Sequence, residues 1–567
     1  MDRLNSVADL TRFRLALQRR RDPYLTEIAV CSDTGCQAWG AEEVASRFEA
    51  ELGGEGTNRK VRVKRVGCMG LCERGPLVAI RPHGIFYQRV SAEDVPEVVS
   101  ETITRYNILG RLLYADPESE KRFVYEPEIP FFAKQKRLLL SLNGLIDPLS
   151  IEEAIVHGGY AALEEVLASW EPARVVDAIE RSGLRGRGGG GFSTGTKWRL
   201  TLLAEGPRKF VICNAAEGDP GAFMDRAVLQ GNPHSVIEGV IIAAYAVGAN
   251  EGYIYLRADY PLAIQRITTA LDQAKEIGLL GENILGSGFD FDIRLFQGAG
   301  AFVCGEETAQ IAAIEGRRGM PRPRPPYPVH SGLFGCPTLV NNVETFANVP
   351  HIIVMGPDVY SLIGTEKSRG TKILALTGKV NNGGLVEVPM GVTMRQVVFD
   401  IGRGIPRDRK CKAVQIGGPS GGCIPEKLLD LPINFDSLRA VGSMMGSGAM
   451  VVMDENTCMV EVARYFLSFT ADESCGQCTP CRIGSKQMLQ ILTKITRGLG
   501  TLKDLERLER IGGLLQRTSL CALGQTCPNP VLSALTYFRD EFEAHIVRKR
   551  CPAGVCEALV LSPCQHT

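Results

Sequence analysis

Eighteen cysteines, most of them gathered in blocks near the two ends of the 567-residue chain, restrict the possible folds more than any other feature. Three of them, Cys475, Cys478 and Cys481, follow one another at three-residue steps, which brings their thiolates around one point. Thiolates gathered in this way suit a metal centre better than a hydrophobic core. We therefore expect a protein that folds around metal–sulfur sites.

Length and composition indicate several soluble domains. A single core rarely grows beyond about 250–300 residues, and 44% hydrophobic with 23% charged residues is ordinary for a globular chain. The 64 basic and 64 acidic residues cancel, so no global charge favours nucleic acid or an anionic membrane. The charged N-terminus lacks a signal-peptide core, and no apolar stretch is long enough for a membrane helix. We expect a cytoplasmic protein without nucleic-acid binding or membrane insertion.

The first cysteine block consists of Cys31, Cys36, Cys68 and Cys72, in two short loops that each follow a predicted strand. Disulfides are rare in a reducing cytosol, which favours metal binding. Four thiolates of this kind bind zinc or an iron–sulfur cluster, and spacing alone does not exclude zinc.

The late block, Cys475, Cys478 and Cys481, has a further cysteine, Cys521, about forty residues downstream. Three thiolates at this spacing plus a distant fourth are a strong iron–sulfur signature, whereas a zinc site usually takes two ligands per turn. The nearby Cys527 is expected to be a bystander.

A last group, His545, Cys551, Cys556 and Cys564, suits tetrahedral zinc. Cys458 is a candidate replacement for one of these ligands. A disordered tail and a subunit interface are the alternatives for this segment.

Between the cysteine blocks, residues 183–191 contain six glycines in nine positions. Such a run lets a planar or phosphorylated ligand approach the backbone, and Arg185, Arg187 and Lys197 add positive charge beside it. The run matches neither a P-loop nor the glycine pattern of a dinucleotide fold. These residues alone indicate a nucleotide or phosphate, with a flexible surface loop as the alternative.

Longer motifs follow the glycine run in a fixed order: 214–221 (NAAEGDPG), 298–308 (GAGAFVCGEET), 321–327 (PRPRPPY) and 340–345 (VNNVET). Together they resemble the flavoprotein subunit of respiratory complex I and of NAD-reducing hydrogenases, NAD-dependent formate dehydrogenases and electron-bifurcating hydrogenases. The segments CSDTGC and GCMGLCERGP resemble the thioredoxin-like [2Fe-2S] domain of such complexes, here fused at the N-terminus.

The resemblance and the residue patterns imply an α/β multidomain fold. A thioredoxin-like [2Fe-2S] domain, an α/β FMN/NADH-binding domain, a β-grasp (ubiquitin-like) domain and a C-terminal helical bundle with a [4Fe-4S] cluster are expected in that order. The expected ranges are an N-terminal helix at 1–23, the [2Fe-2S] domain at 24–105, a linker at 106–149, the FMN/NAD domain at 150–350, the β-grasp domain at 351–450, the [4Fe-4S] domain at 451–548 and a Cys-rich tail at 549–567.

The resemblance also implies the ligand sets. Cys31, Cys36, Cys68 and Cys72 would bind [2Fe-2S], and Cys475, Cys478, Cys481 and Cys521 would bind [4Fe-4S]. No catalytic side chain is expected, because hydride passes directly from NADH to FMN. The expected FMN and NAD(H) contacts are Gly186, Arg187, Gly188, Phe192, Lys197, Asn214, Glu217, Asp219, Phe302, Glu306, Glu307, Arg324, Tyr327, Val340, Asn341 and Asn342.

Three positions depart from the family's usual pattern. Ala216 replaces an aspartate, which removes a polar group near the flavin and leaves its affinity or potential open to change. Phe302 stands in place of tyrosine and Ser193 in place of proline, and we expect both of these changes to be mild.

The resulting hypothesis is an NADH:acceptor oxidoreductase (diaphorase) subunit that passes electrons from FMN through [4Fe-4S] and [2Fe-2S] clusters to partner subunits. The partners would be iron–sulfur subunits and a terminal hydrogenase, formate dehydrogenase or other oxidoreductase, with ferredoxin as a further candidate. One alternative is flavin-based electron bifurcation between NAD(H), ferredoxin and a third acceptor. Another is a cluster-bearing scaffold or redox sensor that has lost turnover.

Overall fold

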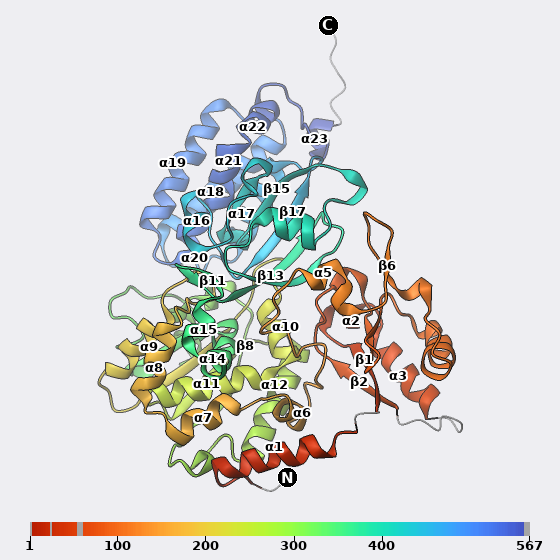
Figure 1. Cartoon of the computed structure of the whole chain (residues 1–567). Coiled ribbons are helices and arrows are strands. Elements are labelled where there is room, and N and C mark those ends of the chain that lie inside the picture. The colour runs from red at the N-terminus through yellow and green to blue at the C-terminus, as the bar shows by residue number, and fades with distance from the viewer. Residues whose placement is uncertain (1–2, 23–24, 54–60, 561–567) are drawn as a thin grey trace.

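The computed structural model describes residues 3–22, 25–53 and 61–560. Figure 1 shows an N-terminal sheet domain (red to orange) beside a larger domain with many helices (yellow to green). A second sheet domain (teal) lies next to both, and a helical region (blue) stands at the opposite end from the first helix, α1 (Val7–Arg20). No helix in these described ranges is long and apolar enough to cross a membrane.

The N-terminal domain is built on a four-stranded sheet of order β2-β1-β3-β4. β1 and β2 are parallel, so their C-terminal ends lie at the same edge, and the two cysteine loops both begin there. The last four residues of β1 are buried, which fits its apolar sequence. The elements are β1 (Thr26–Cys31), α2 (Thr34–Ala38), α3 (Ala41–Leu52), β2 (Val61–Val66), β3 (Val78–Arg81), β4 (Ile85–Tyr87), α4 (Val95–Glu97) and η3 (Val98–Thr104).

The larger domain contains a four-stranded parallel sheet of order β10-β7-β8-β9. From β7 the chain moves outward through β8 and β9 and then returns to place β10 on the other side of β7. In an open parallel sheet, such a reversal leaves a crevice at the C-terminal ends of the two strands. The strands are β7 (Phe210–Ala215), β8 (Glu251–Arg257), β9 (Asp292–Gly298) and β10 (Thr338–Asn342).

Helices pack around this parallel sheet. The most buried is α11, in which an almost continuous apolar sequence matches burial of thirteen of its fifteen residues. The helices are α6 (Ile151–Val156), α7 (Ala161–Ser169), α8 (Pro172–Arg181), α9 (Thr194–Leu203), α10 (Met224–Gly231), α11 (Pro233–Val247), α12 (Pro261–Glu276), α13 (Glu307–Ile314), α14 (Val343–Met355) and α15 (Pro357–Ser361).

The second sheet domain has five strands in the order β14-β13-β17-β15-β16, with only β13 and β17 parallel. Two expected domain boundaries fall inside elements: 350/351 cuts α14, and 450/451 cuts β17, which completes this sheet. The elements are β13 (Thr371–Gly378), β14 (Gly384–Pro389), η9 (Gln396–Ile401), β15 (Cys411–Ile416), β16 (Gly422–Pro425), α16 (Phe435–Ala440) and β17 (Ala449–Asp454).

The C-terminal region is helical. The Thr501 hydroxyl and the Asp504 carboxylate form a reciprocal cap at the start of α19, which explains why the helix begins there. The helices are α17 (Met459–Asp472), α18 (Thr479–Thr496), α19 (Leu502–Thr518), α20 (Ala522–Thr526), α21 (Asn529–Tyr537), α22 (Arg539–Ile546) and α23 (Glu557–Val560).

Buried charges join the N-terminal domain to the rest of the molecule. Lys64 of β2 is 2% exposed and contacts Glu27 of β1 at 2.8 Å and Glu153 of α6 at 2.9 Å. On the second sheet domain, the main-chain amide of Leu385 on β14 donates to the carbonyl of Gly70 in the N-terminal domain at 2.8 Å. On the same strand, the carboxylate of Glu387 accepts three main-chain hydrogen bonds from residues 138–140 of the linker, at 2.9–3.1 Å. The N-terminal domain is therefore docked on two other domains.

Two glycines approach each other closely where the N-terminal domain meets α10. A Cβ atom on Gly67, which directly precedes Cys68 in the loop after β2, would lie 2.2 Å from the Cα of Gly231 at the end of α10. We expect Gly67→Ala to lower the free energy of unfolding by about 2–3 kcal/mol, because the clash is with backbone. Gly110→Ala, which meets nothing within 4 Å, should change it by less than about 1 kcal/mol. Equal midpoints of thermal unfolding for the two variants would contradict close packing of Gly67 against Gly231.

Candidate functional site

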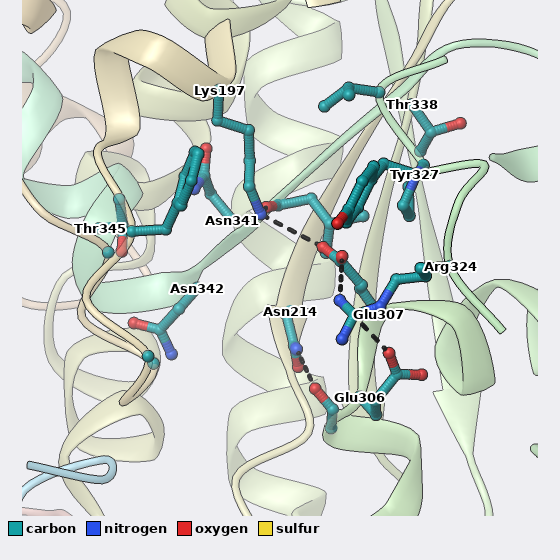
Figure 2. A pocket seen from close by; sticks show the side chains of 18 of the residues that line it. Lys197, Asn214, Glu306, Glu307, Arg324, Tyr327, Thr338, Asn341, Asn342 and Thr345 are labelled. Atoms are coloured by element: carbon teal, nitrogen blue, oxygen red, sulfur yellow. Dashed lines mark hydrogen bonds and ion pairs between the residues drawn. The ribbon is translucent and has the colours of Figure 1, made fainter. Parts of the chain in front are cut away.

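A pocket of about 640 Å³ opens at the C-terminal ends of β7 and β10, where the chain reverses direction across the sheet. Figure 2 shows side chains from α9, from both strand ends, from the start of α13 and from the loop before β10 converging on it. The lining residues are Gly186, Gly188, Gly190, Gly191, Phe192, Lys197, Leu200, Asn214, Gly305, Glu306, Glu307, Arg324, Tyr327, Pro328, Val329, His330, Thr338, Val340, Asn341, Asn342, Thr345 and Ala522.

The glycine run forms one wall of the pocket because side chains would not fit. A Cβ on Gly188 would come within 3.1 Å of the Cβ of Asn342. Gly191 has a φ of +64°, and its Cβ would lie 2.5 Å from the ring of Phe435. Bare backbone therefore faces the pocket, as close approach of a ligand to main-chain amides requires.

A chain of charges crosses the pocket floor (Figure 2). Lys197 of α9 donates to Glu307 at 3.2 Å and to the carbonyl of Val340 at 3.1 Å, and Arg324 reaches Glu307 at 2.9 Å. Burial alone would raise the pKa of Glu307, but Lys197 and Arg324 hold it below its usual value. Glu306 instead caps α13 by accepting the amides of Thr308 and Ala309. Glu307 is therefore an anion held at the centre of the site.

Twelve of the sixteen expected contact residues line the pocket, and four do not. Arg187 is 1% exposed, and its guanidinium donates to the carbonyls of Thr371, Arg185 and Arg369 at 2.6–3.0 Å. Its role is to tie the glycine loop to the second sheet domain. From the sequence alone, an arginine beside a glycine run that binds phosphate looks the same as one that holds the loop in place.

The other three residues lie behind or beside the pocket. The buried carboxylate of Glu217 accepts the main-chain amides of Asp225 and Arg226 at the start of α10. Asp219 is also buried, and burial followed by the charge of Glu217 raises its pKa to about 7. The ring of Phe302 packs edge-on against Phe469 of α17.

Sequence reasoning missed several lining residues. Thr345 ends the VNNVET motif, and its hydroxyl accepts the amide of Arg187 at 2.9 Å. His330 and Thr338 lie between the proline-rich and VNNVET motifs, where no pattern distinguished them. Ala522 follows the cluster cysteine Cys521, and only the fold brings it to this pocket.

The late cysteines line a small cavity of their own at the N-terminal ends of α18 and α20. Ser474 contacts the sulfur of Cys481 at 3.3 Å, and burial raises the pKa of Cys521 to about 11. The cavity is lined by Val303, Pro321, Ser474, Cys475, Gln477, Cys478, Cys481, Leu520, Cys521 and Leu523. Because Ala522 lines the large pocket, the N-terminal end of α20 forms a wall of both sites.

The first cysteine block also converges. The sulfurs of Cys68 and Cys72 lie 3.5 Å apart, and hydrogen bonds from Cys36 and Cys68 hold the pKa of Cys31 well below its usual value. A Cβ on Gly75 would come within 2.9 Å of the sulfur of Cys36, so the loop closes tightly over the thiols.

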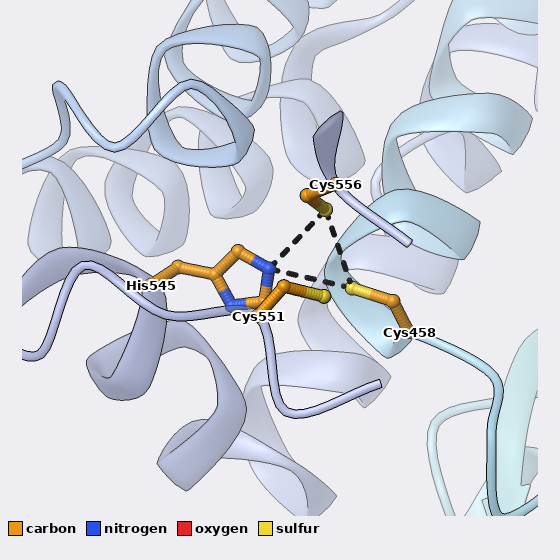
Figure 3. A group of neighbouring side chains, drawn as sticks. All are labelled: Cys458, His545, Cys551 and Cys556. Carbon is orange, nitrogen blue, oxygen red and sulfur yellow. Dashed lines mark hydrogen bonds between the residues drawn. The ribbon is translucent and has the colours of Figure 1, made fainter. Parts of the chain in front are cut away.

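A third group joins the start of α17 to the C-terminal segment (Figure 3). Cys458, His545, Cys551 and Cys556 are all buried, and their ligand atoms lie within 4.8 Å of one another. The sulfur of Cys458 is 3.8 Å from that of Cys556, and Nε2 of His545 is 3.4 Å from both. Cys458 thus completes the group, and the expected ligand Cys564 lies outside the described residues.

Three family models match the chain. Residues 10–103 match the thioredoxin-like [2Fe-2S] ferredoxin, residues 179–351 match the Nuo51 FMN-binding domain, and residues 461–545 match the NADH-ubiquinone oxidoreductase-F iron–sulfur binding region. Fold and site together define a flavin- and iron–sulfur-containing oxidoreductase subunit.

Known relatives are similar over most of their length. NADP-reducing hydrogenase subunit HndC of Solidesulfovibrio fructosivorans is 57% identical over 75% of this chain and 87% of its own. An NADH-quinone oxidoreductase subunit of Aquifex aeolicus is 43% identical over 74% of this chain and 97% of its own. A chain of an NAD⁺-reducing [NiFe]-hydrogenase superposes with a TM-score of 0.65 at 30% identity, covering 95% of this chain and 89% of that one. The protein belongs to the family of these NAD(P)H-linked flavoprotein subunits.

The placement of Arg187 predicts how its removal differs from removal of a pocket arginine. Arg187→Met should lower the free energy of unfolding by about 2–4 kcal/mol, because each buried carbonyl left unpaired costs roughly 1–3 kcal/mol. Arg324→Met, at a partly exposed ion pair, should cost less than about 1 kcal/mol. Thermal unfolding at one pH measures both, and a wild-type midpoint for Arg187→Met would contradict the structural role.

Proposed function

We propose that the pocket binds FMN and NAD(H), and that this chain is the diaphorase subunit of a larger redox complex. The observation that carries the proposal is the wall shared between the two sites: Ala522 lines the pocket, and the preceding Cys521 lines the cavity of the late cysteines. A flavin in the pocket would lie next to a [4Fe-4S] cluster held by Cys475, Cys478, Cys481 and Cys521.

The residues present fit these cofactors. The bare backbone of the glycine run and Lys197 suit the FMN phosphate and isoalloxazine edge, and the amides of Asn214, Asn341 and Asn342 suit its polar atoms. At the mouth, the 56% exposed ring of Phe192 offers a stacking face for a nicotinamide or adenine. FMN, when bound, supplies hydride acceptance and one-electron release.

The acidic residues favour NAD(H) over NADP(H). Glu307 is an anion in the pocket, and a carboxylate of this kind accepts ribose hydroxyls but repels a ribose phosphate. The hydride needs no general base, so the protein's part is to orient the two rings and to exclude water. Arg324, which also faces Glu306, helps to keep Glu307 in place.

We infer that the [2Fe-2S] cluster, on Cys31, Cys36, Cys68 and Cys72, lies on a second side of the flavin. The helix α10 links the two sites. Near its start, Asp225 accepts a hydrogen bond from Asn342 of the pocket, and its last residue, Gly231, lies against Gly67 in the loop that carries Cys68 and Cys72. Its eight residues span about 12 Å. Clusters on two sides of one flavin also fit electron bifurcation to ferredoxin. Reduction of ferredoxin by NADH only in the presence of a third acceptor would favour that second candidate.

Partner subunits would take up the electrons. Iron–sulfur subunits and a terminal hydrogenase, formate dehydrogenase or other oxidoreductase are the proposed partners, in keeping with relatives named as subunits of such enzymes. No disulfide joins the described cysteines, which supports a reducing, cytoplasmic setting.

NADH–ferricyanide activity tests the proposed function. The purified chain should contain FMN, reduce ferricyanide with NADH and show a clear preference for NADH over NADPH. Glu307→Gln should narrow that preference, because the charge that repels the extra phosphate is gone. Asp358→Asn, at an exposed acid of α15, should leave the preference unchanged. A chain with neither flavin nor diaphorase activity would overturn the proposal in favour of a scaffold or redox sensor.

We further propose that Cys458, His545, Cys551 and Cys556 bind zinc. A tetrahedral zinc with bonds of about 2.3 Å sets its sulfur ligands about 3.8 Å apart, the separation found between Cys458 and Cys556. Nδ1 of His545 lies 2.7 Å from the carbonyl of Glu541, which leaves Nε2 facing the thiols. The spacing is too tight for a polynuclear cluster and suits a single structural ion.

The proposed zinc ligands include Cys458, whereas the set expected from the sequence has Cys564 in its place, so replacing each cysteine in turn distinguishes the two sets. We expect Cys458→Ser to lose most of the bound zinc and Cys564→Ser to retain it, as measured by elemental analysis of the purified protein. Iron and FMN contents should stay at wild-type values in both, which shows that the other sites remain folded. Loss of zinc in Cys564→Ser alone would refute the assignment.

A further inference from the structure

The buried carboxyl of Asp225 lies directly behind the flavin pocket. Asp225 is the second residue of α10 and is 3% exposed. Its Oδ2 accepts a hydrogen bond from Nδ2 of Asn342, a pocket residue whose Oδ1 accepts the main-chain amide of Glu344 at 3.0 Å. Both ends of the Asn342 amide are therefore engaged, and Asp225 determines which way it faces.

Two further carboxyls face Asp225 from neighbouring elements. Glu217, in the loop after β7, accepts the main-chain amide of Asp225 at 3.1 Å. Glu344 faces it from α14 and is itself paired with the buried amine of Lys372 on β13. The Oδ1 atom of Asp225 has no hydrogen-bond partner among the described residues. The buried thiol of Cys213 on β7 also faces Asp225. Asp225 is thus an acid without a cation of its own.

Its electrostatic surroundings favour the protonated form. Burial, followed by the charges of Glu217 and Glu344, raises the pKa of Asp225 well above its ordinary value, against the smaller opposing effects of Lys372 and the Asn342 hydrogen bond. On its own helix, the Arg226 side chain lies instead over the ring of Tyr260, 5.2 Å from its centroid.

We propose that Asp225 is a positioning residue that orients Asn342 and carries a proton that responds to the charge of the flavin pocket. The inference rests on the proposed function. Negative charge that enters the pocket with the electrons from NADH strengthens proton binding by a nearby carboxyl. By linkage, a proton held on Asp225 then favours the reduced site by the same free energy. The proton comes from solvent and returns there when the electrons leave.

The pH dependence of the midpoint potential of bound FMN tests the proton-binding role. In the full chain, Asp225→Asn keeps an acceptor for Asn342 but cannot ionise, so its potential should fall less steeply with rising pH than that of the wild type. Asp358→Asn, at an exposed carboxyl, should keep the wild-type slope. Equal slopes of midpoint potential against pH for the wild type and Asp225→Asn would overturn the proton-binding role.

FMN affinity tests the positioning role. On deflavinated protein titrated with FMN, Asp225→Ala should bind about 3–10-fold more weakly, because the Asn342 amide loses its anchor. Asp225→Asn should bind FMN within about twofold of the wild-type affinity. Asp225→Glu, which can still ionise, should keep the wild-type slope of the FMN midpoint potential against pH. Wild-type affinity for Asp225→Ala would overturn the positioning role. A wild-type chain without FMN would instead refute the proposed function itself.

Discussion

The reversal of the chain across β7 is the constraint on which the other sites depend. Because β8 and β9 lie on one side of β7 and β10 on the other, the loops after β7 and β10 diverge and leave a crevice between them. The glycine run can form the third wall only because it has no side chains. The helical region then adds the cluster loop at Cys521 to the same crevice. Each redox site is thus defined by its position relative to two parallel strand ends.

Buried carboxylates connect the domains around this crevice. Glu387 accepts three amides of the linker, Glu217 accepts two at the start of α10, and Glu153 neutralises Lys64. Hydrogen bonds to buried charged groups are strong and directional, and a buried carboxylate without them would be costly. The ion pair between Lys64 and Glu153 joins the [2Fe-2S] domain to the flavin domain, which suits electron transfer by tunnelling between fixed positions more than transfer by a mobile carrier.

The motifs predicted the chemistry better than the three-dimensional contacts. The order of the glycine run and the later motifs, through the family resemblance that they carry, was enough to predict an α/β domain and most of the residues that line the pocket, but not the parallel sheet. The role of Arg187 could not be predicted, because two of its three acceptors are carbonyls about 180 residues away that carry no side-chain signal. Ala522 was missed for a related reason, because a long stretch of chain separates it from the other residues that line the pocket. Cys458 was a candidate from the sequence, and only the fold shows that it lies in the group with His545. The sequence did not show that α14 and β17 continue across the expected domain boundaries at 350/351 and 450/451.

The contact between Cys458 and Cys556 spans 98 residues of sequence and encloses the four late cysteines. In polymer terms it closes a loop. A metal bond at this point would restrict the unfolded chain much as a disulfide does, by an amount worth about 4–5 kcal/mol for a loop of this length. The helical region would then fold and unfold as one segment. The stability of its [4Fe-4S] site would therefore depend on the contact between Cys458 and Cys556, which lies at the other end of the region.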